Sequence, residues 1–284
     1  MFAHEFIRNA YLAGTFTALA AGVVGWFVVL RAQVFAGDAL SHIAFTGTVA
    51  AAAIGIDARI GLFAGTLGLA AVMAALGPRV AVEDATIGTV FAWILGLGVL
   101  FETLAAGGTG IATANTLFGS IFGLDAAHAR VAAGVALAAA IATAALARPL
   151  LFASVDPAVA RASGVPVRAV GVAFMLILGA VAGEATQAVG ALLLLGLIAA
   201  PAGAARRLTA DPWTGLALST AIAVACMWIG LALSYAINGL PPSSAVILTA
   251  AVTYLLAAAF AGRMRATARL PWLRGSVADQ DALG

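Results

Sequence analysis

The chain has 284 residues, of which 63% are hydrophobic and only 9% are charged, and its mean hydropathy is +1.09. A soluble domain carries roughly 25% charged residues, so this composition excludes an ordinary soluble protein and indicates an all-α, polytopic helical membrane protein. The formal net charge of +2 gives no support to nucleic-acid binding.

Uncharged segments along the chain predict about nine transmembrane helices, with eight as the alternative. Only Glu184 and Gln187 interrupt the run from 168 to 205, whereas the turn-forming residues Asn238–Ser243 divide the uncharged stretch that follows. No small-residue cleavage site follows the first segment, so we expect that segment to be retained. The predicted spans are 10–30, 39–56, 60–78, 85–105, 129–147, 168–186, 188–205, 213–236 and 244–262.

The arginines predict the orientation of these spans. All fourteen basic residues are arginines. Placing the loop 148–168 in the cytoplasm puts eleven of them inside and leaves Arg8, Arg59 and Arg130 outside, which the positive-inside rule favours. The N-terminus is then outside and the C-terminus cytoplasmic. We therefore predict a transmembrane domain over residues 1–265 and a cytoplasmic tail over 266–284.

The segment Gly37–His42 places an acid and an imidazole at the start of an apolar run. In a helix, Asp38 and His42 lie four residues apart and share a face. Ionisable groups inside a membrane are costly and tend to be functional, and a carboxylate with an imidazole can bind a divalent metal. In the structural alternative, Asp38 is a helix N-cap and His42 pairs locally. With Arg31 in the cytoplasm, Asp38 would begin its span near the cytoplasmic face. Either the segment 31–38 climbs into the bilayer before the span begins, or a metal would reach this pair late on its way across the membrane.

The absence of lysine excludes a conventional P-loop, because that loop needs its lysine to reach the nucleotide phosphates. If ATP drives transport, the ATPase is another polypeptide. In that case the chain would be the membrane subunit and not the enzyme that hydrolyses ATP.

The loop 148–168 contains a short segment with helix start and stop signals. Asp156 suits the N-cap, Pro157 the first helical position and Gly164 the C-terminal cap, while Pro166 prevents continuation. The pattern predicts a two-turn helix at 157–163 with the shape of a rigid knob for a partner's groove. An ordinary amphipathic connector on the membrane surface is the alternative.

Other polar residues lie near the outer ends of predicted spans. Glu184 is either a second metal ligand or entry-gate carboxylate, or a group that reaches the outer interface or bonds to Gln187. Asp125 and His128 could touch an arriving metal, but a helix N-cap with a solvated histidine is the preferred interpretation.

Several motifs occur together in the order seen in one family. They are Gly37–His42, Glu83–Gly88, Leu117–Gly119, Asp156–Gly164 and Val189–Leu193. Over roughly residues 10–262 the chain resembles the permease subunit of zinc/manganese-type ABC importers. The resemblance implies a homodimer in the bacterial plasma (inner) membrane, two cytoplasmic ATP-binding cassette ATPase subunits and an extracytoplasmic metal-binding protein. Metal would move inward by ATP-driven alternating access.

By this resemblance, Asp38 and His42 match the carboxylate and histidine of the metal pathway. Two protomers would together supply four N/O ligands, which suit zinc. We expect zinc as the transported ion, with manganese or iron as the alternative, and no tightly bound cofactor. The resemblance also assigns coupling to the ATPase to Asp156, Pro157, Ala160, Arg161 and Gly164.

This sequence departs from the family directly after the histidine. Ile43–Gly47 replaces the usual pattern that ends in Leu-Pro-Gly, so the local kink is in question while the ligands are kept. Glu184 also departs from the family, which is normally apolar there.

Three other functions use similar features. A secondary ion transporter would use the membrane carboxylates without an ATPase, but the 157–163 helix and the missing inverted repeat weigh against it. An intramembrane metalloprotease needs a His-Glu-x-x-His motif, whereas the histidines at 4, 42 and 128 are scattered. A chelate permease would need a wide aromatic or polar cavity rather than an Asp-His pair.

Overall fold

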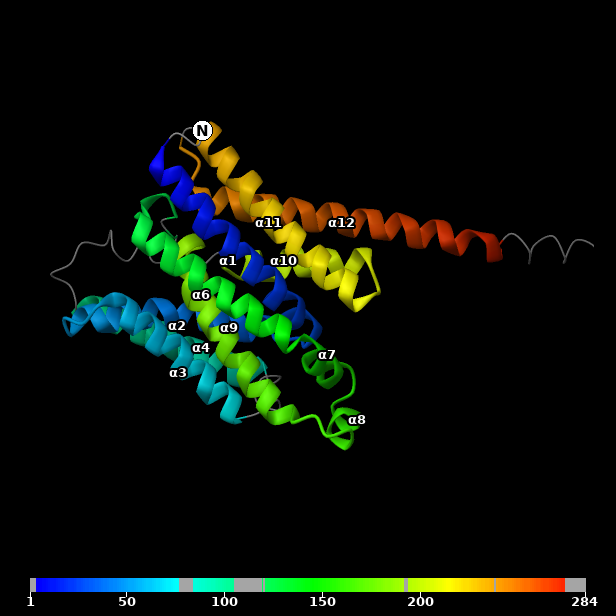
Figure 1. Cartoon of the computed structure of the whole chain (residues 1–284), viewed down its shortest axis with the longest axis horizontal. Coiled ribbons are helices and arrows are strands. Elements are labelled where there is room, and N and C mark those ends of the chain that lie inside the picture. The colour runs from blue at the N-terminus through cyan, green and yellow to red at the C-terminus, as the bar shows by residue number, and fades with distance from the viewer. Residues whose placement is uncertain are drawn as a thin grey trace, which may run out of the picture.

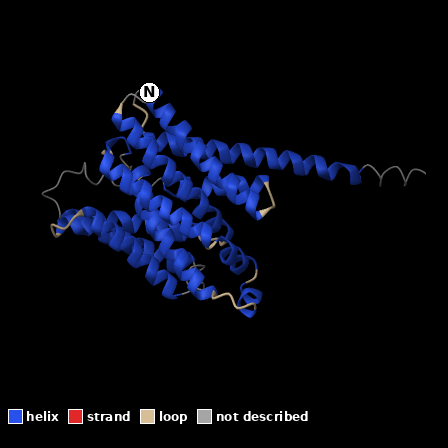
Figure 2. Ribbon diagram, viewed as in Figure 1, coloured by secondary structure: helices blue, strands red, loops and turns tan. Residues whose placement is uncertain are grey.

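The computed structural model describes residues 4–76, 84–104, 119, 121–191, 194–237 and 239–273. Within these ranges every regular element is a helix and no strand occurs (Figure 2). Seven of the described helices are long and apolar enough to cross a membrane, and Gly88–Leu104 forms a shorter apolar helix. The predicted fold class of a polytopic helical membrane protein is confirmed.

Each of the nine predicted spans corresponds to a helix in the described part of the chain. These helices are α1 (Glu5–Leu30), α2 (Val34–Ala53), α3 (Ala58–Leu76), α4 (Asp84–Leu104), α6 (Ala126–Ala145), α9 (Val167–Val189), α10 (Leu194–Leu208), α11 (Pro212–Ala236) and α12 (Pro242–Leu273). Shorter elements are η2 (Ile121–Gly123), α7 (Ala147–Val155) and α8 (Pro157–Ala162). The fifteen residues of α10 extend only about 22 Å, less than the hydrocarbon thickness.

Helix α1 lies at the centre of the bundle, between α6, α10 and α11 (Figure 1). Small residues allow this packing, since helices in lipid associate through close backbone contact. A Cβ atom at Gly25 would collide with the carbonyl oxygen of Ile198 on α10. At Gly22, the hydroxyl of Ser219 on α11 donates to the carbonyl at 2.8 Å.

Helix α2 packs between α3 and α4. On its α3 side, Gly47 and Gly61 bring the two backbones together, and a Cβ atom on either glycine would collide with the other's carbonyl oxygen. On its α4 side, the Thr46 hydroxyl donates to the Ile94 carbonyl at 2.9 Å. The helix continues without a break through Ile43–Gly47, where the family's proline is missing.

The glycine contact between α2 and α3 predicts a position-specific loss of stability. Gly47→Val should destabilise the permease by about 1–3 kcal/mol, because the added methyl groups have no space. Gly68→Val on α3 is the matched control, since no atom lies within 4 Å of a Cβ there. Thermal unfolding in detergent measures both, and equal melting temperatures for the two variants would contradict the close-packing interpretation.

The 148–168 loop is more ordered than expected. It holds α7 as well as the predicted α8, and both lie at one end of the bundle (Figure 1). Helix α8 ends at Ala162, one residue before the predicted end at 163, and Gly164 follows with a φ of +85°. The left-handed conformation is the one that favours glycine at a helix terminus.

Two other boundaries differ from the sequence predictions. The break between the sixth and seventh spans lies at Gly190, which adopts a φ of +90°, and not at Gln187. Helix α12 continues from its apolar part to Leu273, beyond the predicted span end at 262. The predicted tail 266–284 therefore begins inside a helix.

Candidate metal pathway

Asp38 and His42 lie one turn apart on α2, as their spacing predicts. Asp38 Oδ1 and His42 Nε2 are 3.8 Å apart, and the side chains are 22% and 9% exposed. The N-cap of α2 is Gln33, not Asp38, so the capping alternative for Asp38 is wrong. The pair is therefore positioned by an uninterrupted helix and retains donor atoms for a ligand.

The imidazole of His42 has no hydrogen-bond partner to orient it. Its Nδ1 atom is buried and unpaired. The ring packs edge-on against Phe91 of α4, with ring centroids 4.7 Å apart. A buried polar atom without a partner is costly, so Nδ1 is available for a ligand, while Nε2 faces Asp38 and the aromatic ring restricts the direction of the imidazole.

The pair lies deeper in the bundle than the start of the predicted span suggests. Gly37, next to Asp38, faces Leu178, which is midway along α9. Arg31 lies closer to the start of α9, where its guanidinium approaches Gly171. The chain between Arg31 and Asp38 thus runs along α9 from near Gly171 to near Leu178.

A single chain supplies an incomplete metal site. Among the described residues there is no group of three or more His, Cys, Asp or Glu side chains that could hold an ion. Asp38 and His42 offer two ligands, fewer than the four that zinc takes in a structural site. Weak coordination of this kind is compatible with release of a transported ion.

Glu184 belongs to a second polar cluster, with Gln187 on α9 and Arg59 on α3. Arg59 Nε donates to Gln187 Oε1 at 3.1 Å, and Arg59 also interacts electrostatically with Glu184. Four buried atoms of the cluster lack a hydrogen-bond partner: Arg59 Nη2, Gln187 Nε2 and both carboxylate oxygens of Glu184. Glu184 is 2% exposed, so it does not reach the surface of the bundle. Because both of its carboxylate oxygens are unpaired, it does not bond to Gln187 either.

Helix α8 has the capped geometry that the sequence predicts. The Asp156 carboxylate accepts hydrogen bonds from the backbone N–H groups of Ala158 and Val159, both at 2.9 Å. Ala160 is fully buried, which gives it a packing role rather than a contact surface. Val155 and Val159 are 72% and 49% exposed, and neither is among the residues that the sequence predicts to contact the ATPase.

The sequence profile of the ABC 3 transport family matches residues 3–261, nearly the whole chain. The chain belongs to this family. It is a multi-pass permease of the bacterial plasma membrane, and its resemblance to permeases of zinc/manganese-type ABC importers is confirmed.

Relatives and a solved structure match the permease over most of its length. The manganese import system permease protein ScaB of Streptococcus parasanguinis is 29% identical over 262 residues, which cover 92% of each chain. The manganese transport system membrane protein MntC of Halalkalibacterium halodurans is 29% identical, covering 90% of this chain and 88% of that protein. The structure of PsaBC from Streptococcus pneumoniae in complex with Fab matches with a TM-score of 0.79 and 27% identity, covering 90% of this chain and 91% of the other.

Asp125 and His128 of the permease form a helix cap, as the preferred interpretation predicts. Asp125 Oδ1 accepts from the backbone N–H of His128 at 2.7 Å and lies 2.6 Å from the ring Nδ1. These hydrogen bonds lower the pKa of the Asp125 carboxyl. Both residues are exposed, so this Asp-His pair differs from Asp38 and His42 in burial and in having its acceptor oxygen occupied.

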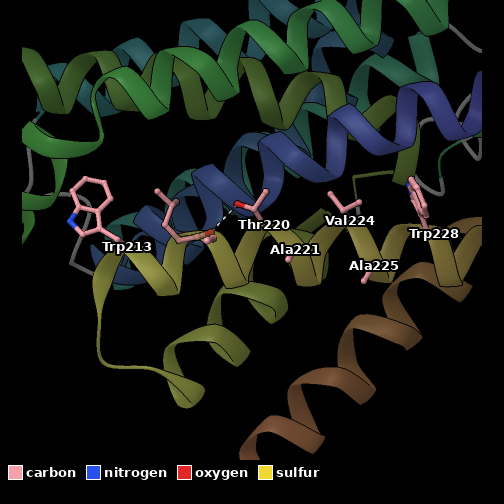
Figure 3. A pocket seen from close by; sticks show the side chains of 8 residues that line it. Trp213, Thr220, Ala221, Val224, Ala225 and Trp228 are labelled. Atoms are coloured by element: carbon pink, nitrogen blue, oxygen red, sulfur yellow. Dashed lines mark hydrogen bonds between the residues drawn. The ribbon is translucent and has the colours of Figure 1, made fainter.

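A groove of about 690 Å³ on α11 runs between Trp213 and Trp228 (Figure 3). All of its lining residues belong to α11, and none is ionisable. Its hydroxyl group, on Thr220, already donates to the Leu216 carbonyl at 2.9 Å. The groove lacks donor atoms for a metal and is not part of the candidate pathway.

Sequence reasoning missed the neighbours that shape the candidate pathway. Phe91 is one of many aromatic residues in apolar spans, and only the packing of α4 on α2 brings it to His42. The sequence placed Arg59 only among the outer arginines. Its hydrogen bond to Gln187 was not predictable, because the two residues are far apart in the sequence. Leu117 and Phe118 of the family motifs lie outside the described residues.

Proposed function

We propose that the permease moves manganese into the cell as the membrane subunit of an ATP-driven importer. The relatives ScaB and MntC are named for manganese, and one carboxylate with one imidazole suits that ion as well as zinc or ferrous iron. The sequence-based expectation of zinc has no comparable support from these relatives. Iron and zinc remain the competing cargoes in the experiment below.

The observation that carries this proposal is the pair of the half-buried Asp38 and the buried His42, which lies beside the middle of α9. One protomer supplies only these two ligands, so two protomers of a homodimer would contribute four N/O donors to one axial site. In a single chain His42 Nδ1 has no hydrogen-bond partner, and Nε2 lies 3.8 Å from Asp38 Oδ1. Separation of the protomers would break such a shared site into two weak two-ligand halves, so the metal could be bound during passage and then released.

ATP hydrolysis and metal capture belong to partners in this proposal. The chain contains no lysine for a P-loop, so a separate cytoplasmic ATPase would bind at α8. An extracytoplasmic metal-binding protein would deliver the ion at the opposite end. Coupling would involve Asp156, Pro157 and Gly164 as the residues that shape α8, with Arg161 on its exposed face.

Reconstitution tests the proposed cargo. The permease, its ATPase and its binding protein in proteoliposomes should accumulate manganese when ATP is supplied, with zinc and ferrous iron offered in parallel assays. Preferential zinc uptake would correct the cargo and keep the importer. If an assembled complex with active ATPase accumulates none of these ions, the metal-ion proposal fails and a chelate becomes the expected substrate.

Glu184 is proposed as a second, transient binding site for the transported metal. Its unpaired carboxylate oxygens and the electrostatic partner Arg59 occur near the end of α9 that lies away from α8. A cation that arrives there would compensate the buried negative charge, which is otherwise costly in a membrane. The ion would then pass along α9 towards Asp38 and His42.

Glu184→Gln is expected to lower manganese uptake by about tenfold at limiting metal, the lower end of losses for groups that support a metal site. The substitution keeps the side-chain shape and removes the charge. Glu102→Gln on α4 is the matched control, because that glutamate is partly exposed. Uptake rates at several metal concentrations measure both variants, and equal rates for Glu184→Gln and the unsubstituted permease would remove Glu184 from the path.

A further inference from the structure

A cavity of about 390 Å³ lies at the α8 end of the bundle, apart from the candidate metal pathway. It is bounded by the turn between α1 and α2, the last turn of α3, α8 and the first turns of α9. Three arginines line it: Arg31, Arg161 and Arg168. Gln33 adds an amide, and none of the described lining residues is acidic.

Arg31 is the preorganised member of this set. Its Nε atom donates to Gln33 Oε1 at 3.2 Å, and its guanidinium lies over the Phe174 ring at 5.5 Å from the centroid. The ring and the amide fix the direction of the planar fork, while Nη1 is buried and has no hydrogen-bond partner. A guanidinium presents paired donors that match the oxygens of a phosphate group.

Three positive charges around one cavity attract an anion, although Arg161 and Arg168 are exposed and Arg161 Nε also donates to the Pro157 carbonyl at 3.0 Å. The described lining offers neutral methionine, alanine and leucine side chains in addition to the polar groups, such as Met73, Leu76 and Met175. Every polar side chain in the described lining is therefore positively charged except Gln33, which is neutral. Because no described lining residue is acidic, the lining offers a cationic group no counter-charge and favours an anionic ligand.

An apolar groove continues from the cavity along α9. The two share Arg161, Val167, Arg168 and Val172, and the groove extends to Leu176. Its surface is almost wholly apolar, and Leu176 is exposed at its far end. A ligand that filled both would have an anionic head among the arginines and a hydrocarbon chain along α9.

We propose that this cavity binds the phosphate group of an anionic phospholipid. Basic pockets between transmembrane helices on the cytoplasmic side are suited to such headgroups, and the arginine distribution predicts this end of the bundle to be cytoplasmic. Free phosphate shares the head-group chemistry but would leave the groove empty. The groove therefore favours the lipid as the source of the phosphate.

Retention of lipid by the purified full-length permease tests this proposal. Native mass spectrometry would compare phosphatidylglycerol with phosphatidylcholine of the same acyl chains. We expect preferential retention of phosphatidylglycerol and a loss of about fivefold for each of Arg31→Gln and Arg168→Gln, as removal of one interfacial charge predicts. Arg148→Gln on α7 is the matched control, since this exposed arginine does not line the cavity.

Melting temperatures of the variants distinguish a loss of lipid binding from a loss of folding. Arg168 is exposed, so we expect its substitution to leave the helix bundle intact. Displacement of the lipid by millimolar inorganic phosphate would support binding of the lipid phosphate among the arginines. Binding of inorganic phosphate without any retained lipid would overturn the proposal in favour of the free ion. Equal retention of both lipids, or an equal loss in Arg148→Gln, would overturn the proposal. So would loss of ATPase co-purification in Arg168→Gln with lipid retention unchanged, which would make the cavity a protein-docking site.

Discussion

Replacing Asp38 or His42 with alanine is expected to abolish ATP-driven manganese uptake while the permease still assembles with its partners. Loss of a group that only supports a metal site costs about 10–100-fold in affinity, so loss of a ligand should reduce uptake by at least about 100-fold. Both residues lie on a continuous helix that is packed by Gly47 and Thr46. The substitutions remove donor atoms and, at His42, the ring contact with Phe91, while the contacts of Gly47 and Thr46 that hold α2 remain.

The chain contains its own control for this experiment. Asp125 and His128 are the same residue types, also on one helical face, but exposed and paired with each other. Asp125→Ala and His128→Ala should leave uptake within about twofold of the unsubstituted permease, since surface substitutions change little. Radioactive or fluorescent metal uptake measures all four variants. Undiminished uptake by Asp38→Ala and His42→Ala would reject the site and leave Glu184 as the next candidate.

Val159→Asp is expected to uncouple the permease from its ATPase. Val159 is half-exposed on α8, and the following residue, Ala160, faces inward, so the change affects the outer surface alone. An unpaired carboxylate in an apolar partner groove should weaken binding by about 30-fold, the effect of losing a contact worth about 2 kcal/mol. The isosteric variant Val159→Thr introduces no charge and should retain most of the coupling.

Two readouts distinguish uncoupling from misfolding. Co-purification of the ATPase should fall in Val159→Asp, as should ATPase activity stimulated by the binding protein, while the melting temperature of the isolated permease stays unchanged. The Asp156 cap is preserved because it binds the backbone N–H of residue 159 and not its side chain. Full stimulation in Val159→Asp would place the ATPase contact elsewhere on the permease.

Local signals in the sequence were sufficient for much of this fold. Asp156, Pro157 and Gly164 specify α8 through caps and a fixed φ, which depend on neighbouring residues only. The spacing of Asp38 and His42 likewise placed both on one face of α2. Such features are predictable because their physical cause lies within a few residues.

Other features depend on contacts between distant segments. The depth of Asp38 depends on how α2 climbs along α9, and no pattern within 31–42 encodes the contact of Gly37 with Leu178. The burial of Glu184 depends on its packing beside α3, so the sequence left open whether it reached the interface. Gly190 and Gln187 both interrupt the same apolar run, and the positive φ that ends α9 became evident only in three dimensions.

Helix α9 runs past three regions of the permease to which separate roles are proposed above. Its 23 residues extend about 34 Å, from the arginine-lined cavity beside α8, past the contact with Gly37, to Glu184 and Gln187. A stiff rod of this length amplifies small rotations: a tilt of about 5° at one end displaces the other by about 3 Å. A shift of that size is enough to break the 3.1 Å hydrogen bond between Arg59 and Gln187, so a push on α8 could open the far end of the bundle with no helix changing its internal structure.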